Sequence, residues 1–469
     1  MNRMKYLAKN TLIFTLGNFG SKLISFVLVR LYTDALTKEQ YGIVDLITTI
    51  CMVLVPIIYL NINEAVMRFS LDEDANPNEI MSIANLIMLV AIVPGALFAC
   101  GTLFYPKVAP YALYVFLYAI SMGTSQVAMG YLRGREYLLK FSIGSILQTL
   151  FIAVFNILFL LVFKMGIEGY LTSYILAYTL TAGFAFIAGH TFDTLKHFHI
   201  NKKLSGEMIK YSIVLVPNSF MWWIMNSADR FMVTEMRSTE ENGVYAVSYK
   251  LPTIVSVMAG VFNQAYSYSA IKENNSEDRD EYNGRVYDAF FTFMIFVGMG
   301  LLIILKPLMS IYVAEEFYEA WLYSPPLILG SVLLALGTFL ANFYVVNKDS
   351  KGFMLSATTG AVLNIVLNVC LIPLWGALGA AIATCASYMA VYIYRYFDVK
   401  KYVTIRVFSA QNVLSILVII AACFAEYLPL VYSLPTQGAL AIVFFFLKRK
   451  SVIEVFRKLL EHLKKEKTE

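Results

Sequence analysis

Four of the basic residues that fall within apolar stretches of this chain are candidates for chemistry, because ionisable groups are costly there. Lys22, Arg30, Arg230 and Lys250 lie inside segments long and apolar enough to cross a membrane. A charge at the centre of a spanning helix costs about 2.5–3.5 kcal/mol, so such residues usually face a water-filled cavity or a partner. We therefore expect these four residues to line a cationic lumen, which selects for anions. The alternatives are snorkelling to the membrane surface and an acidic partner that the sequence does not reveal.

Acidic residues within the same stretches are fewer. Asp45, Asp229 and Glu426 are the clearest. Asp45 lies at a depth comparable with that of Arg30, so a structural Arg30–Asp45 pair is one interpretation. Asp45 and Asp229 are also the candidates for ion pairing or ion coupling within the lumen.

Two prolines within spans are candidate hinges. Pro217 and Pro252 lie on the same stretches as Arg230 and Lys250. Proline removes a backbone donor and bends a helix, and such breaks often border the moving parts of transporters. A simple bend that shapes the fold is the alternative for each of them.

The elements that position these residues are predicted by composition. The chain has 469 residues, of which 59% are hydrophobic and 15% charged, with a mean hydropathy of +0.65. Soluble domains carry about 25% charged residues. The composition therefore predicts an all-α polytopic membrane protein. Its five cysteines form no close-spaced pair, so neither a disulfide framework nor a zinc site is expected.

Apolar windows between charged, proline or glycine breaks predict about fourteen spanning helices. They cover residues 10–31, 41–62, 80–104, 111–132, 142–163, 169–190, 209–232, 244–269, 286–308, 323–346, 353–373, 378–397, 407–427 and 434–447.

Orientation follows from the distribution of the 37 Lys and Arg residues. Most of them fall in alternate loops and in both tails, which places both termini in the cytoplasm by the positive-inside rule. Because they are scattered over short loops, the net charge of +5 gives no reason to expect a nucleic-acid partner. Residues 448–469 are basic and amphipathic, typical either of a helix on an anionic leaflet or of a solvated tail.

Two stretches of sequence recur about 200 residues apart. Arg30 precedes the segment 39–43, and Arg230 precedes the similar segment 240–244. Asn156 leads to residues 166–170, and Asn368 leads to residues 376–380. Such repeats mark many transporter folds, although chance similarity between apolar helices is the alternative. We expect two parallel six-helix lobes around a central cavity, residues 1–200 and 201–400, followed by two further helices in 401–447.

Enzyme signatures are absent from the sequence. It contains no P-loop, no HExxH and no nucleophile elbow. We therefore expect neither an enzyme nor a bound cofactor or metal.

The opening segment carries a family resemblance. Residues 10–23 (NTLIFTLGNFGSKL), with Arg30, Tyr41-Gly42 and the segment 63–68 (NEAVMR), resemble the polysaccharide-unit flippases. These Wzx-like proteins are part of the multidrug/oligosaccharidyl-lipid/polysaccharide exporter (MOP) superfamily. The glycine pairs 166/169 and 376/379 resemble the same superfamily, so the likeness covers nearly the whole chain.

The resemblance implies a bacterial inner-membrane flippase. Its substrate would be an undecaprenyl-pyrophosphate-linked oligosaccharide, moved to the outer leaflet by alternating access for capsule, O-antigen or exopolysaccharide assembly. Membrane lipids, a polysaccharide polymerase and assembly proteins are the implied partners. The lipid II flippase fits the charge pattern nearly as well and is the alternative. Cation-coupled multidrug exporters fit less well, because they often carry an acidic residue in the first helix, where this chain has Lys22.

Overall fold

The computed structural model describes residues 24, 26–72, 76–192, 194, 198–272, 278–347 and 349–466. All regular structure within these ranges is helical. Helices suit a bilayer because every backbone polar group is bonded within its own segment. Nine of the described helices are long and apolar enough to cross a membrane, or ten if one bent pair counts as a single span. The predicted all-α polytopic class is confirmed.

Some of the fourteen predicted spans do not correspond to one separate crossing helix. Most of the first, 10–31, lies outside the described residues. The predicted spans 353–373 and 378–397 are both contained in α14 (Ser350–Val399), and 209–232 lies in the long helix α9 (Lys202–Met236). The span expected over 407–427 is the shorter helix α15 (Ala410–Ala425).

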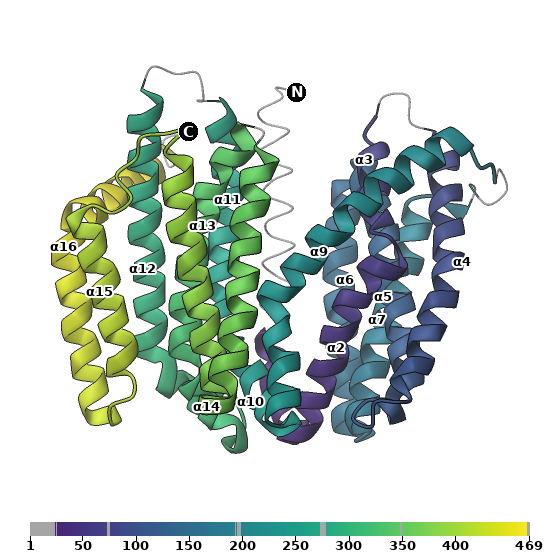
Figure 1. The fold of residues 1–469 in the computed structure, drawn as a ribbon, viewed down its shortest axis with the longest axis horizontal. Coiled ribbons are helices and arrows are strands. Elements are labelled where there is room, and N and C mark those ends of the chain that lie inside the picture. The colour runs from purple at the N-terminus through teal and green to yellow at the C-terminus, as the bar shows by residue number, and fades with distance from the viewer. Residues whose placement is uncertain are drawn as a thin grey trace. The chain divides into compact units, whose positions relative to one another are not determined.

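The chain divides into two compact units, Met1–Gly243 and Val244–Glu469. Besides α9 and the helical residues 26–35, the first unit contains α2 (Lys38–Ile58), α3 (Ile62–Phe69), α4 (Pro77–Thr102), η1 (Ala109–Tyr111), α5 (Ala112–Gly134), α6 (Leu138–Asn156), η2 (Ile157–Val162), α7 (Gly166–Ala188) and the start of α10 (Thr239–Ser248). Helix α5 packs against α3 and α7, α6 packs against α7, and α2 packs along α9 (Figure 1).

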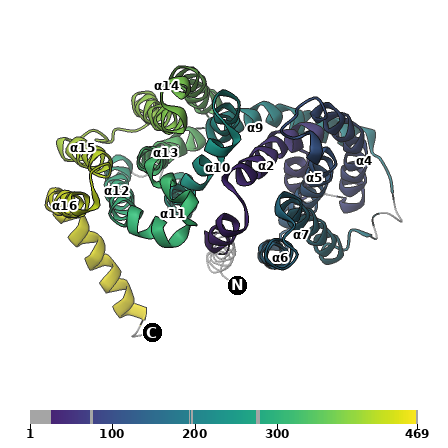
Figure 2. The ribbon, with the colours of Figure 1, turned by 90° about the horizontal axis from the view of Figure 1, so that it is seen from below.

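The second unit contains the rest of α10 and seven further elements. Besides α14 and α15, these are α11 (Pro252–Lys272), α12 (Arg279–Tyr312), η3 (Glu315–Leu322), α13 (Ser324–Val346) and α16 (Leu430–Glu466). Helix α13 packs against α14, and α15 and α16 pack against each other and against α12 (Figures 1 and 2). The boundary between the units differs from the predicted lobe boundary at residue 200, which stays a prediction.

Two helical hairpins, one in each unit, share a backbone feature. Gly166 at the start of α7 and Gly376 inside α14 both have φ of 58°. This left-handed conformation favours glycine because it has no Cβ. Three residues later, a Cβ on Gly169 would lie 3.1 Å from the carbonyl oxygen of Phe159, and one on Gly379 would lie 2.3 Å from that of Leu371. The second pair of sequence repeats therefore has the same local geometry in both units.

Polar contacts join the α15–α16 pair to α12. Lys306 of α12 donates to the carbonyl oxygen of Leu428 at 2.7 Å and also to that of Glu426. Nearer the start of α12, the Asp288 carboxylate accepts a hydrogen bond from Lys448 of α16. The Glu426 carboxylate accepts hydrogen bonds from Ser433 and Gln437, both at 3.0 Å. Lys306 near the end of α12 and Asp288 nearer its start thus hold the last two helices.

The N-terminus of α14 is held by Asp349. Its carboxylate accepts a backbone hydrogen bond from Gly352 at 2.8 Å and a second bond from the Tyr402 hydroxyl at 2.8 Å, and Lys401 lies 3.1 Å away. These contacts favour the charged form. The backbone N–H of Gly352 contributes most, and together they lower the pKa of Asp349 to about 2.

Candidate substrate-translocation site

Helix α9 crosses the first unit and carries several of the predicted site residues. Its N-terminus is capped by Asn201, which accepts bonds from the backbone N–H groups of Lys203 and Leu204. Further along, Ser219 accepts a hydrogen bond from Asn61 at 2.8 Å, and the Trp223 indole donates to the Thr49 carbonyl oxygen at 2.9 Å. These bonds hold α9 in a defined rotation against α2 and α3.

Arg230, six residues before the end of α9, forms an ion pair with Asp45 of α2. The Arg230 Nη1–Asp45 Oδ1 distance is 3.0 Å, and the side chains are 17% and 7% exposed. Asn242 of α10 donates from Nδ2 to the Gly42 carbonyl oxygen at 3.3 Å and to Asp45 Oδ2 at 3.5 Å. Both oxygens of the Asp45 carboxylate therefore have a donor, one charged and one neutral.

Two glycines allow α2 and α10 to cross at this site. A Cβ on Gly42 would lie 1.8 Å from the Thr239 carbonyl oxygen, and one on Gly243 would lie 2.0 Å from the Lys38 carbonyl oxygen. Each obstructing carbonyl lies four residues before the opposite glycine, so the crossing is nearly symmetric. It joins the two segments that the sequence repeat had matched.

The N-terminal caps of these two helices are matched as well. Thr37 accepts a bond from the backbone of Gln40, and Ser238 accepts one from the backbone of Glu241. On α2 the Gln40 side-chain oxygen also accepts a hydrogen bond from the backbone N–H of Thr37, which completes a capping box. The caps set where each helix starts and hence where Asp45 and Asn242 lie.

Asp229 occupies a different environment from Asp45. It is 1% exposed, and its Oδ1 accepts a hydrogen bond from the backbone N–H of Arg230 at 2.9 Å. The two adjacent residues Asp229 and Arg230 thus place a carboxylate and a guanidinium on one turn of α9.

Of the remaining predicted cations, Arg30 and Lys250 lie in the described part of the chain. Arg30 forms an ion pair with Asp34 at 2.8 Å, in which the side chains are 47% and 44% exposed. The Arg30–Asp45 pair considered from the sequence is replaced by these two separate pairs, because Asp45 faces α9. Lys22 lies outside the described residues. Lys250 is half-buried in the second unit, in the break between α10 and α11.

The two predicted hinge prolines differ in position. Pro217 lies inside α9, whereas Pro252 is the first residue of α11. Helices α10 and α11 meet at 43° across the break before Pro252. A proline is well tolerated at a first helical position because no intrahelical donor is lost there.

Three buried polar side chains in the second unit were not predicted as site residues, although Asn368 was used to mark the repeat. Asn368 donates to Asn364 Oδ1 at 2.9 Å, and Asn364 donates to the Thr384 hydroxyl at 3.3 Å. All three side chains are buried within the two halves of α14. The available signal was two asparagines one helical turn apart inside an apolar stretch.

Arg395 lies within the predicted span 378–397, was not singled out as a site residue, and is buried in the structure. Its guanidinium donates to the Ser356 hydroxyl and to the Gly337 carbonyl oxygen, both at 3.0 Å. It is 4% exposed and lies over the Phe353 ring. Arg395 therefore joins α13 to both halves of α14.

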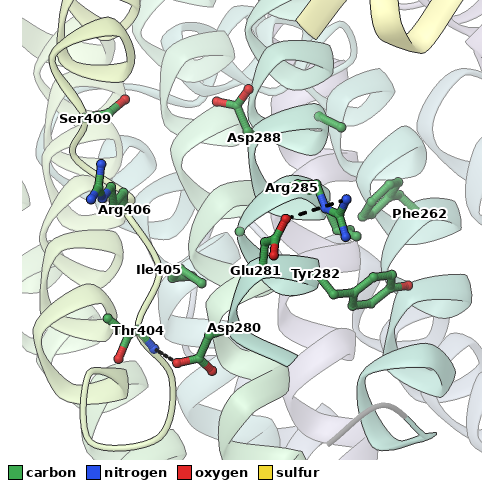
Figure 3. Close-up of a pocket in the computed structure, with 13 residues that line it drawn as sticks. Phe262, Asp280, Glu281, Tyr282, Arg285, Asp288, Thr404, Ile405, Arg406 and Ser409 are labelled. Carbon is green, nitrogen blue, oxygen red and sulfur yellow. Dashed lines mark hydrogen bonds and ion pairs between the residues drawn. The ribbon is translucent and has the colours of Figure 1, made fainter. Parts of the chain in front are cut away.

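A groove of about 890 Å³ lies in the second unit between the start of α12 and the segment 404–409 (Figure 3). Asp280 accepts a bond from the Thr404 backbone at 3.0 Å, and Glu281 lies 3.8 Å from Arg285. Both acidic and basic side chains line its wall. The groove therefore lacks the single sign of charge expected of the anion-selective lumen.

The two units have a polytopic all-α fold, and solved structures share it. The chain is similar to "Lipid II flippase MurJ, inward closed conformation", with a TM-score of 0.63, 14% identity, and coverage of 94% of this chain and 100% of that chain. It is also similar to an inward-facing multidrug resistance MATE family transporter of the MOP superfamily, with a TM-score of 0.67, 14% identity, and coverage of 87% and 96%. A MOP superfamily transporter from Pyrococcus furiosus gives a TM-score of 0.59, 13% identity, and coverage of 84% and 94%.

The family is shown by sequence. The profile of the polysaccharide biosynthesis protein family matches residues 7–270, which is more than half of the chain. The chain therefore belongs to the polysaccharide biosynthesis protein family, and the predicted resemblance to Wzx-like flippases of the MOP superfamily is confirmed. No curated protein matches the sequence.

Proposed function

We propose that this protein is a flippase for undecaprenyl-pyrophosphate-linked oligosaccharide units. It moves them from the cytoplasmic to the outer leaflet of the bacterial inner membrane by alternating access, for capsule, O-antigen or exopolysaccharide assembly. The observation that carries the proposal is the family match over residues 7–270 in a chain with a transporter fold. Both termini are cytoplasmic in this proposal, as the distribution of basic loop residues predicts.

The proposed binding group for the headgroup is the set of intramembrane cations. Lys22, Arg30, Arg230 and Lys250 attract the pyrophosphate or acidic sugars, while the polyprenyl tail stays in lipid. Arg230 is the best-defined member, because Asp45 and the backbone of α9 set its position. A pyrophosphate oxygen can replace Asp45 as the acceptor of the Arg230 guanidinium. The freed Asp45 carboxylate then keeps a donor in Asn242.

The membrane potential supplies a driving force in this mechanism. An inside-negative potential favours outward movement of an anion by about 2.3 kcal/mol per charge per 100 mV. A doubly charged headgroup gains twice that amount. Pro217, Pro252 and the bend before α11 are the proposed hinge positions.

Depletion of the protein tests the proposal. Undecaprenyl-linked oligosaccharide should accumulate on the cytoplasmic face while peptidoglycan synthesis continues, as measured by leaflet-resolved analysis of lipid-linked sugars. The test variant is Lys22→Ala with Lys250→Ala, and the matched control is Lys202→Ala with Lys203→Ala, two exposed lysines at the start of α9. If the double variant exports polymer and binds an anionic lipid-linked sugar as the unchanged protein does, the cationic-lumen mechanism is wrong.

Lipid II transport is the second candidate function. The lipid II flippase structure matches this chain over 94% of its length and is itself covered completely. In this case depletion would cause lipid II to accumulate and cells to lyse. The same leaflet-resolved measurement separates the two substrates, because their sugar units differ in composition.

A further inference from the structure

The membrane-crossing part of α16 has a defined end. Its apolar portion covers Leu430–Arg449, while the helix itself continues to Glu466. At the boundary, Lys448 is 1% exposed, donates to Asn412 Oδ1 at 2.5 Å and pairs with Asp288. These contacts fix the point at which α16 leaves the helices of the second unit.

Beyond this point α16 changes direction. Figure 2 is viewed along the crossing part of α16, and it shows the last turns of the helix running across the line of sight. The last turns therefore leave the direction of the crossing part, as a helix does when it turns to lie along a membrane surface.

The sequence of these last turns is amphipathic. At 3.6 residues per turn, all seven Val, Ile, Phe and Leu residues of 452–463 fall within about 160° of the helix circumference. They are Val452, Ile453, Val455, Phe456, Leu459, Leu460 and Leu463. No charged residue of 452–465 falls within this arc. A face of this width is broad enough to be buried to a shallow depth in a bilayer surface.

The charges are ordered around the opposite face. Arg457 and Lys464 lie on one flank of the apolar arc and Lys458 and Lys465 on the other, as the helical period places them. Glu454 and Glu461 fall between these flanks, opposite the centre of the apolar arc. Basic residues at the polar–apolar boundary can reach lipid phosphates along their long stems, whereas acidic residues furthest from the apolar arc remain in water.

We propose that residues 452–465 form a surface helix bound to anionic phospholipid on the leaflet where α16 ends. The sign and order of the charges favour an anionic lipid surface over an acidic protein groove, which would repel the two glutamates at the centre of the polar face. The anchor at Lys448 keeps the helix within reach of the surface. Each basic residue near an anionic leaflet adds about 1 kcal/mol, or about a fivefold gain in partitioning.

Site-directed spin labelling of the full-length protein tests this proposal. The two exposed cysteines, Cys100 and Cys370, are replaced by serine, and single cysteines are introduced at positions 454, 456, 460 and 461. The protein is reconstituted in vesicles of phosphatidylcholine alone or with phosphatidylglycerol. Collision rates with oxygen and with a water-soluble nickel chelate report the depth of each label.

The expected result is a pattern with the period of a helix. Labels at 456 and 460 should be protected from nickel, and labels at 454 and 461 should be accessible. Replacing Arg457, Lys458, Lys464 and Lys465 by glutamine should reduce the protected fraction in anionic vesicles to that in phosphatidylcholine. Glu454→Gln with Glu461→Gln is the matched control, and it should leave the protection in place.

Two results would overturn the proposal. Equal accessibility at all four positions in anionic vesicles would indicate a solvated tail. Protection that persists in detergent without phospholipid would indicate that the helix docks on protein, either on this chain or on a second copy.

Discussion

Arg230 and Asp45 are separated by 185 residues in the sequence, yet their side chains form an ion pair of 3.0 Å inside the first unit. The pair joins α9 to α2 at the point where α10 begins its crossing. Asn242 supplies the second donor to the same carboxylate. A cation predicted to bind substrate is therefore held by an acid predicted to take part in ion pairing.

Removing one partner of this pair should destabilise the protein. Asp45→Ala leaves the Arg230 guanidinium largely buried without its carboxylate, at a cost of about 3–5 kcal/mol. We expect a lower midpoint of thermal unfolding in detergent and reduced substrate export. The exchange Asp45→Arg with Arg230→Asp should recover part of the stability. Asp34→Ala is the control, because its pair with Arg30 is exposed. Equal midpoints for Asp45→Ala and Asp34→Ala would contradict the prediction.

Alanine at the helix crossing should be poorly tolerated. Gly42→Ala and Gly243→Ala each place a Cβ within 2.0 Å of a backbone carbonyl oxygen, which cannot move aside as a side chain can. We expect each substitution to lower the free energy of unfolding by about 1–3 kcal/mol, as measured by denaturant titration in detergent.

Gly183→Ala in α7 is the matched control for the crossing. A Cβ there has no atom within 4 Å, so alanine should be neutral or stabilising by up to about 1 kcal/mol. If Gly42→Ala behaved as Gly183→Ala does, the close crossing of α2 and α10 would be wrong.

The cap of α14 should depend on pH. The pKa of Asp349 is about 2 in the folded protein, below the usual value of about 3.9. Its contribution to stability is therefore complete above pH 4 and is lost as the pH falls towards 2. Asp349→Asn should lower the unfolding midpoint at pH 6, and the difference from the unchanged protein should shrink between pH 4 and pH 3. A constant difference over this range would show that charge is not the cause.

Lys306 should be required for the position of the α15–α16 connection. Lys306→Met removes the donor to the carbonyl oxygens of Glu426 and Leu428 and the cation 4.2 Å above the Trp321 ring. We expect faster hydrogen exchange in residues 426–433, with little change in α13. Ser310→Ala on the same helix is the control. Unchanged exchange in residues 426–433 would contradict the role of Lys306.

Composition and hydropathy alone determined the class of this protein, because a chain with 59% hydrophobic residues and long apolar stretches can satisfy its backbone in a bilayer only as helices. The sequence also indicated a repeat of the segments 39–43 and 166–170 at 240–244 and 376–380, and Gly166 and Gly376 in the second pair share one backbone conformation in the structure.

Only the tertiary structure decided which residues meet. The sequence indicates the depth of Asp45 from its distance to the end of its span. Arg30 and Arg230 both lie near that depth, so depth alone does not decide which of them pairs with Asp45. A spanning helix is apolar on all faces, so hydropathy carries little information about which face meets which neighbour. The rotation of α9 and the crossing at two glycines paired Asp45 with Arg230, and these features depend on side-chain packing between segments far apart in the chain.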